Sequence, residues 1–365
     1  MIEEVSAAFD RKDYRNAAQL LKDLVKQEPQ NPWVQLYVGR LHEVTGKLEA
    51  AETAYLMLLR NTTIPKIMTA ARQGMQRLAE MEKETKRQAL AKSKASPDAE
   101  EQGVLVLEPI ADDAKTAAAQ KFARIMQLDP YTARLHLPSR SWRLYRAGSV
   151  GELRYYGQQL DEAEIPSFWA SIADIKKINV FRINYFESEA KQPTVFCQNE
   201  HDQQGSLAFN WSEVEARVEG LLPIFEEVVD MDVRRKLQRK TKTLDYAHFC
   251  DLHLPARRSI LRLCDRNYQF QNGIVLSQTK HAQAQPISQQ TTRTNWNSLL
   301  NFVNQNLPQT RIWSDFTAFA ETGVEQVQLL QRFNSHVDLL RREDTPWDCA
   351  FHLYSGLVFL RHANS

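Results

Sequence analysis

Apolar residues recur every three or four positions through the first quarter of the chain. They do so in three successive stretches, residues 2–27, 32–60 and 66–95. Positions i, i+3, i+4 and i+7 share one face of an α-helix, so this spacing predicts amphipathic helices that each bury one face. The third stretch becomes more polar along its length, which is typical of a helix that caps a helical stack. We therefore expect an all-helical domain over residues 1–91.

After residue 103, helical spacing is mixed with the alternation of β-strands, which places successive side chains on opposite faces. Strands are predicted at 178–187, 194–197, 206–211, 222–230, 244–254, 258–264 and 349–360, and a short strand or an extended tether at 104–109. Helices are predicted at 113–127, 150–163 and 296–306, and over 324–340 after a capping box of Thr322 and Glu325. Residues 104–365 thus predict an α+β domain with an antiparallel sheet, and the chain as a whole is α+β.

Turn and loop signals separate these elements. The charged, proline-containing segment 92–103 predicts a flexible linker between the two domains. Asn272-Gly273 between two apolar runs predicts a β-hairpin. Ser212 with Glu215 predicts the start of a short helix that ends near Gly220. The glutamine-rich segment 281–293 predicts a solvated loop, at which a subdivision of the second domain is an open alternative.

Residues 31–65 carry small and aromatic residues at fixed positions of a helical hairpin. Gly39 stands where two helices cross, Gly46 where the first helix ends, and Ala51 and Tyr55 on the inner face of the second helix. The same pattern occurs once before, with equivalent residues at Tyr14, Ala17 and Leu21. The segment resembles a tetratricopeptide repeat, a helix–turn–helix unit whose two copies here stand in the phase that the repeat requires. The departures from the repeat are Gln35, His42, Leu58 and a proline displaced to Pro65.

The resemblance implies a scaffold that binds a protein partner. In such repeats the first helix of each hairpin lines a groove for a peptide or helix of the partner. Trp33, Tyr37 and Arg40 lie on that helix and are the predicted contacts. The alternative for Trp33 is packing against the preceding repeat. The resemblance covers the first quarter of the chain, and the remainder resembles no family that we recognise.

Composition adds limits on class and compartment. Apolar residues make up 43% of the 365 residues, enough for more than one core. The net charge of +1 gives no overall attraction to nucleic acid or membranes. The four cysteines are widely spaced without a CxxC pair, which suits a reducing compartment. No signal peptide or apolar run of ~18 residues is found, so no transmembrane segment is predicted. We expect a cytoplasmic protein and leave its oligomeric state open.

Local motifs of catalysis or cofactor binding are missing from the sequence. GxGxxG, P-loop, HExxH, GxSxG and EF-hand patterns do not occur. His248, Cys250, Asp251 and His253 are of metal-ligand types. On a strand, however, the first two face one side and the last two face the other. We therefore expect no metal site and no cofactor, and we assign no catalytic residue.

Positive charge is concentrated at 231–266, where ten lysines and arginines stand against four aspartates. This segment predicts an exposed turn or ribbon that contacts an acidic partner through Arg234, Arg235, Arg239 and Lys240. A solvated loop that only aids solubility is the alternative. Aromatic residues also alternate with arginines over 134–156, which indicates either a stacking surface for bases or a core covered by arginine stems.

Together these patterns favour a non-enzymatic adaptor, scaffold or assembly factor. It would bind a protein partner through the repeat groove and through a basic surface of the α+β domain. Two alternatives remain: a protein that binds nucleic acid or another anionic ligand, and an enzyme whose site comes from distant residues without a local motif.

Overall fold

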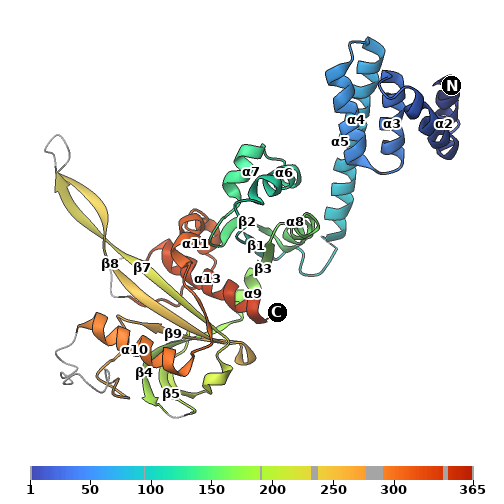
Figure 1. Ribbon diagram of the computed structural model, residues 1–365. Coiled ribbons are helices and arrows are strands. Elements are labelled where there is room, and N and C mark those ends of the chain that lie inside the picture. The colour runs from blue at the N-terminus through green and yellow to red at the C-terminus, as the bar shows by residue number, and fades with distance from the viewer. Residues whose placement is uncertain are drawn as a thin grey trace. The chain divides into compact units, whose positions relative to one another are not determined.

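A computed structural model describes residues 2–93, 95–189, 191–231, 237–276, 291–339 and 344–363. The chain divides into two compact units, Met1–Lys92 and Ser93–Ser365. The first unit is helical, and the second contains helices and two β-sheets (Figure 1). The α+β class predicted from the sequence is confirmed. None of the described helices is long and apolar enough to cross a membrane.

The first unit consists of two helical hairpins and a long fifth helix, as the apolar spacing predicts. Its helices are α1 (Ile2–Asp10), α2 (Tyr14–Gln27), α3 (Pro32–Val44), α4 (Leu48–Asn61) and α5 (Pro65–Ser93). The Asn31 side chain accepts a hydrogen bond from the backbone N–H of Trp33 and caps α3. Gly46 follows α3 with φ +76°, the left-handed conformation that ends helices and suits glycine.

The Tyr55 ring joins the second hairpin to α5. It is fully buried, together with Ala51 one turn before it on α4. A Cβ atom at Gly39 would lie 2.8 Å from this ring, and one at Gly74 of α5 would lie 2.5 Å from it. Glycine at both positions therefore lets α3 and α5 approach the two sides of the ring, which confirms the crossing predicted at Gly39.

The second unit begins with a three-stranded antiparallel sheet, here called the small sheet. Its strand order is β2 (Arg143–Ser149), β1 (Gln102–Leu107) and β3 (Ser167–Ser171). Leu105 and Leu107 of β1 are buried against α6 (Lys115–Met126), α7 (Pro130–His136) and α8 (Val150–Glu162). Residues 95–101 lie against α8, where Asp98 forms an ion pair with Arg154 at 2.6 Å. The backbone N–H of Gly151 also donates to Ala99 O at 3.0 Å.

The large sheet has seven strands in the order β10, β7, β8, β9, β4, β5, β6. Their bounds are β4 (Asn179–Ser188), β5 (Thr194–Gln198), β6 (Gln204–Ala208), β7 (Ala216–Met231), β8 (Leu237–Leu254), β9 (Ser259–Cys264) and β10 (Arg311–Trp313). Neighbouring strands are antiparallel except for the pairs β10–β7 and β4–β9, which are parallel. The large sheet is therefore mixed, with both parallel and antiparallel neighbours.

Helices cover both faces of the large sheet. One face packs against α9 (Ile172–Lys176), α11 (Phe316–Gly323), α12 (Val327–Leu330) and α13 (Pro346–Ala363). The other face packs against α10 (Thr292–Asn306). Strand β8 alternates between the two cores: Ala247 and Phe249 belong to the α13 side, and Cys250 and Leu252 to the α10 side. Short 3₁₀ turns, η1 (Trp211–Glu213) and η2 (Pro255–Arg257), connect the strands.

The prediction of a final strand at 349–360 is wrong, since these residues form most of helix α13. Residues 350–359 are buried throughout, because the sheet and several helices surround α13. A helix buried on all sides has no polar stripe, so its apolar run does not distinguish it from a buried strand.

The helix predicted over 324–340 is also wrong. Helix α11 ends at Gly323, α12 covers Val327–Leu330, and residues 331–339 contain no helix. In that segment the carbonyls of Ser335 and His336 accept hydrogen bonds from Arg262, at 2.8 and 3.3 Å. His336 has φ +51°, outside the helical region. A tertiary contact has thus replaced local helical bonding.

Two turn predictions are wrong as well. Instead of starting a helix, Glu215 donates its N–H to His253 O, and β7 begins at Ala216. Asn272-Gly273 forms no hairpin, because β9 ends at Cys264 and the segment around Gly273 packs along β4. Ile274 N donates to Phe186 O at 2.9 Å there. In the glutamine-rich segment, residues 281–290 lie outside the described residues.

Candidate protein-binding surfaces

The three residues predicted to line the groove are all on α3, but they differ in environment. Tyr37 is 8% exposed and packs against the Phe9 ring, with 5.5 Å between the ring centroids. Trp33 is half-buried and contacts both hydrophobic clusters of the unit. The Arg40 guanidinium lies 5.0 Å from the Phe9 ring centroid and 5.8 Å from that of Tyr37. The positively charged guanidinium of Arg40 is thus held in place beside the rings of Phe9 and Tyr37.

A buried carboxylate connects successive repeats of the same unit. Glu43 of α3 accepts hydrogen bonds from Tyr55 Oη at 2.6 Å and from Arg77 of α5 at 2.6 and 2.9 Å. Burial disfavours the charged form of Glu43, but the bonds from Arg77 and Tyr55 outweigh it and lower the pKa of this carboxyl. Glu43 and Arg77 are separated along the chain by one repeat period. This pair is not predicted by the helical spacing, although its separation of one repeat period was the available signal.

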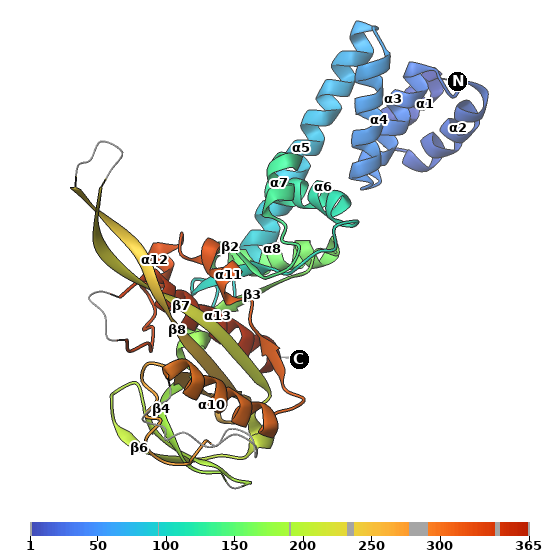
Figure 2. The same cartoon turned by 60° about the vertical axis from the view of Figure 1, so that its left-hand side comes forward.

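The basic residues Arg239 and Lys240 lie on a two-stranded ribbon that we call the arm. The arm comprises residues 223–231 of β7 and 237–246 of β8, which pair with each other and, among the described residues, with no further strand. Figure 2 shows β7 and β8 continuing beyond the large sheet. Arg239 and Lys240 are exposed and, as neighbours on a strand, lie on opposite faces. Arg234 and Arg235 lie outside the described residues.

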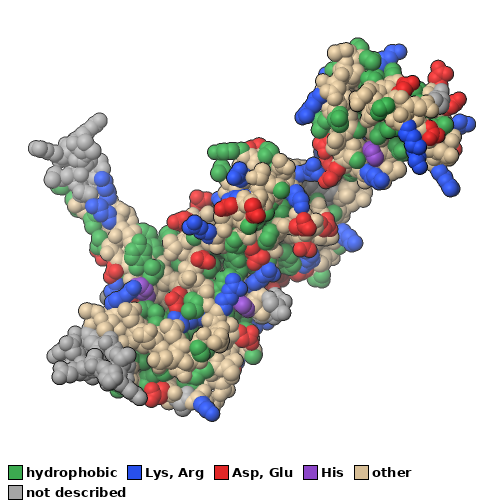
Figure 3. All heavy atoms as spheres, in the orientation of Figure 1, with side chains coloured by type: hydrophobic (Ala, Val, Ile, Leu, Met, Phe, Trp, Pro, Cys, Tyr) green, Lys and Arg blue, Asp and Glu red, His purple; other side chains and the backbone are tan. Residues whose placement is uncertain are grey.

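Exposed hydrophobic side chains also lie on the arm. Leu237 is 74% exposed, Val229 is 65% exposed and Tyr246 is 47% exposed. The cross-strand register places all three on the face that carries Arg239, with Val229 directly opposite Arg239. In the space-filling view, the arm shows hydrophobic side chains beside lysine and arginine side chains (Figure 3). This face is therefore apolar and charged at once.

The charge of the basic stretch is largely balanced by neighbouring acids. On the arm, Lys242 is paired in register with Glu226, and Arg239 forms an ion pair with Glu227 at 3.8 Å. Arg262 is buried against Asp251, and further pairs join Arg257 to Glu213, Arg258 to Asp174 and Arg266 to Asp245. The net positive charge of the arm is thus smaller than the sequence of β8 by itself suggests.

The four residues of metal-ligand type are split between the two faces of β8, as predicted. Cys250 is buried on the α10 side. Asp251 and His253 are buried on the α13 side, where the Ser355 hydroxyl donates to Asp251 at 2.6 Å and lies 2.9 Å from His253 Nε2. Burial lowers the pKa of His253 to about 4. Across the described ranges, no three His, Cys, Asp or Glu side chains gather in a metal-binding arrangement.

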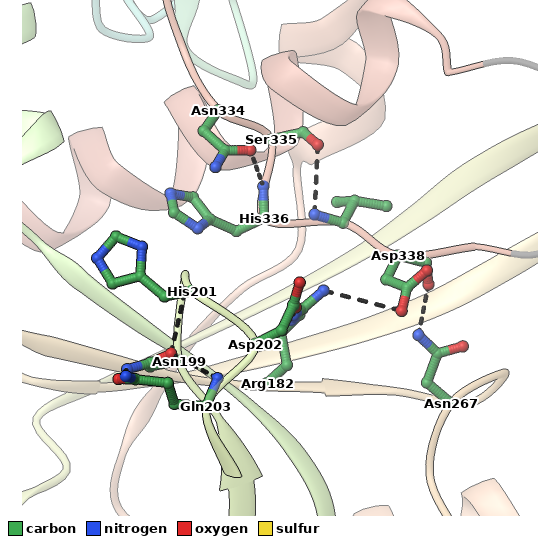
Figure 4. A network of polar contacts seen from close by, with 11 residues as sticks. Arg182, Asn199, His201, Asp202, Gln203, Asn267, Asn334, Ser335, His336 and Asp338 are labelled. Carbon is green, nitrogen blue, oxygen red and sulfur yellow. Dashed lines mark hydrogen bonds and ion pairs between the residues drawn. The ribbon is translucent and has the colours of Figure 1, made fainter.

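Asp251 begins a row of charged side chains across the large sheet. Arg262 donates to its two oxygens at 2.9 and 2.7 Å, and Arg182 stands next to Arg262 in the β4–β9 register. Arg182 pairs with Asp202 and lies 3.8 Å from Asp338 (Figure 4). Because Arg262 also binds the carbonyls near residue 335, this row holds the segment 331–339 against the sheet.

Comparisons with known proteins bear on the first unit. Residues 8–62 match the family model described as Tetratricopeptide repeat, which confirms the resemblance read from the sequence. The matched region includes α2, α3 and α4. No curated protein and no solved structure matches the chain. The repeat indicates a role in protein interaction in general terms.

Proposed function

We propose that the protein is a non-enzymatic adaptor or assembly scaffold that holds a partner protein through two surfaces. The repeat match at residues 8–62 carries this proposal, because such hairpins commonly present a groove to a peptide or helix. In the first unit we assign the contact to Arg40 and the exposed part of Trp33. Tyr37 then acts from the core, where it holds the Arg40 guanidinium in place.

The arm is the proposed second surface. A two-stranded ribbon buries little apolar area by itself and is marginally stable in water without further packing. Exposed apolar side chains grouped on one face are typical of protein-binding sites. Val229, Leu237 and Tyr246 form such a group on the Arg239 face, and Lys240 adds a positive charge on the opposite face, which together favour a partner with apolar and acidic side chains. Arg234 and Arg235 belong to the same proposal from the sequence alone.

Two further points belong to the proposal. The four cysteines are free, and Cys197, Cys250 and Cys264 are buried, which fits a cytoplasmic location. Residues 92–103 are proposed to join an N-terminal repeat domain, 1–91, to the α+β domain, 104–365. Residues 95–101 contact α8, which fits a connecting segment that is packed against the second domain over this part of its length.

Affinity purification of the tagged full chain from its native cells, followed by mass spectrometry, tests the function. For the arm, Val229→Ser with Leu237→Ser should reduce partner recovery at least tenfold. Leu135→Ser on α7, which removes a 59% exposed leucine elsewhere, should leave recovery unchanged. For the repeat unit, Arg40→Ala is compared with Arg60→Ala, an exposed arginine of α4. Equal recovery with all four variants would contradict the proposed surfaces.

The same purification decides between a protein partner and nucleic acid. If nuclease treatment removes the co-purified material and its binding weakens steeply with salt, the arm binds nucleic acid instead. The exposed Glu226 and Glu227 of the arm argue for a protein partner, because their carboxylates would repel phosphates.

A further inference from the structure

A cavity of about 430 Å³ lies between the small sheet and the large sheet of the second unit. On one side it is lined by Glu108 after β1 and by Arg140 and Trp142 before β2. On the other side lie Arg311 and Trp313 of β10 and Arg361 of α13. Its volume falls in the range of small-ligand sites, and none of the functions proposed above uses it.

Aromatic side chains build a rigid wall of this cavity. Trp142 is 5% exposed, and its ring centroid lies 4.8 Å from that of Trp313 and 4.8 Å from that of Phe168. The Trp313 Nε1–H donates to His362 Nε2 at 3.2 Å, which fixes the orientation of the indole. Trp313 itself is half-buried, so part of its ring faces the cavity. These contacts hold the two indole rings side by side at the cavity.

The cavity also carries an excess of positive charge. Its lining includes three arginines against two carboxylates, Glu108 and Asp315. Arg361 is paired with Glu108 at 3.2 Å. The Arg311 guanidinium lies 3.9 Å from the Trp313 ring centroid, so stacking holds it in place. Within the described part of the chain, the guanidinium groups of Arg140 and Arg311 have no hydrogen-bond or ion-pair partner.

We propose that this cavity binds a small organic anion with a planar ring. The ring would stack on the Arg311 guanidinium, which itself lies on Trp313, and its phosphate or carboxylate would receive hydrogen bonds from Arg140 and from the edge of Arg311. Guanidinium groups are suited to both anions because their N–H groups form a planar fork. A nucleotide and an aromatic carboxylate share this chemistry.

Calorimetric titration of the full chain tests the proposal with adenosine monophosphate and benzoate as probes. Adenosine and inorganic phosphate serve as matched probes for adenosine monophosphate, and benzamide and acetate for benzoate, because each lacks either the anion or the ring. At least one ring-bearing anion should bind ten times more tightly than its matched probes. Binding of adenosine monophosphate alone would identify a phosphate ligand, and binding of benzoate alone a carboxylate ligand. Absence of binding by both would overturn the proposal.

Variants then place the binding in this cavity. Arg311→Gln and Arg140→Gln should each weaken the bound probe at least tenfold, while Arg134→Gln, an exposed arginine of α7, should change nothing. Trp313→Phe keeps a ring in the wall and should retain most of the affinity, while it reduces the quenching of indole fluorescence to the part that comes from Trp142. Unchanged affinity in both arginine variants, with folding verified by circular dichroism, would refute the site.

Discussion

The buried ion pair of Arg262 and Asp251 allows a sharp test of what holds the large sheet and its covering segment together. The two side chains are 1% and 0% exposed. Arg262→Met keeps most of the apolar stem but removes the guanidinium. Asp251 then retains only the Ser355 hydroxyl, and the carbonyls of Ser335 and His336 lose their donor. The perturbation is therefore electrostatic, with little change in packed volume.

The expected loss in the free energy of unfolding follows from the Asp251 carboxylate, which stays buried without its ion-pair partner. Removing one member of a buried ion pair costs about 3–5 kcal/mol, because the remaining charge stays desolvated. Replacing both members, as in Arg262→Met with Asp251→Leu, leaves no uncompensated charge and should cost about 2 kcal/mol or less. The double variant should thus be more stable than either single variant. Arg257→Met, which breaks a partly exposed pair with Glu213, should cost less than about 1 kcal/mol.

Urea unfolding followed by indole fluorescence measures these differences. Six of the seven tryptophans lie in the second unit, so the signal reports mainly on that unit. Hydrogen exchange of peptides from β8, β9 and α13 provides a local measure and does not require the whole chain to unfold in one step. A loss below about 1 kcal/mol for Arg262→Met, or a double variant that equals the sum of the singles, would refute this account of the pair.

Three further predictions address other parts of the molecule. Ala51→Trp should cost about 1–3 kcal/mol by overpacking, whereas Thr53→Trp on the exposed side of α4 should not; thermal melts that fall equally would show that the assigned helix phase is wrong. Stability should fall as pH drops from 6.5 toward about 4, because the unfolded chain protonates His253 near 6.5 and the folded chain only near 4. This group should account for about 2 kcal/mol at about pH 5, so urea unfolding of His253→Gln should show a shallower pH dependence, and an unchanged dependence would exclude His253 as its source. Limited proteolysis should separate the two units by a cut at residues 92–94 rather than within 95–103, because residues 95–101 are bonded to α8 and β1 begins at Gln102, and a first cut within 95–103 would argue against that packing.

Local sequence determined the parts of this protein that depend on contacts within one element or between adjacent ones. The repeated small and aromatic positions and the glycine at position 46 identified the helical hairpins, because helix spacing and a left-handed turn are properties of short segments. The alternation of β8 separated Cys250 from Asp251 and His253 for the same reason, since successive strand residues face opposite sides.

Tertiary structure alone decided the features that join distant segments. An apolar run such as 349–360 suits a buried strand or a buried helix, and only the space between the sheet and its covering helices selected the helix. Residues 331–339 are not helical despite their apolar spacing, and two of their carbonyls instead accept hydrogen bonds from Arg262, more than 70 residues away. Trp142 and Trp313 form one wall although 171 positions separate them. Such contacts follow from strand order and helix placement, which no local pattern specifies, because they arise when separate elements pack together.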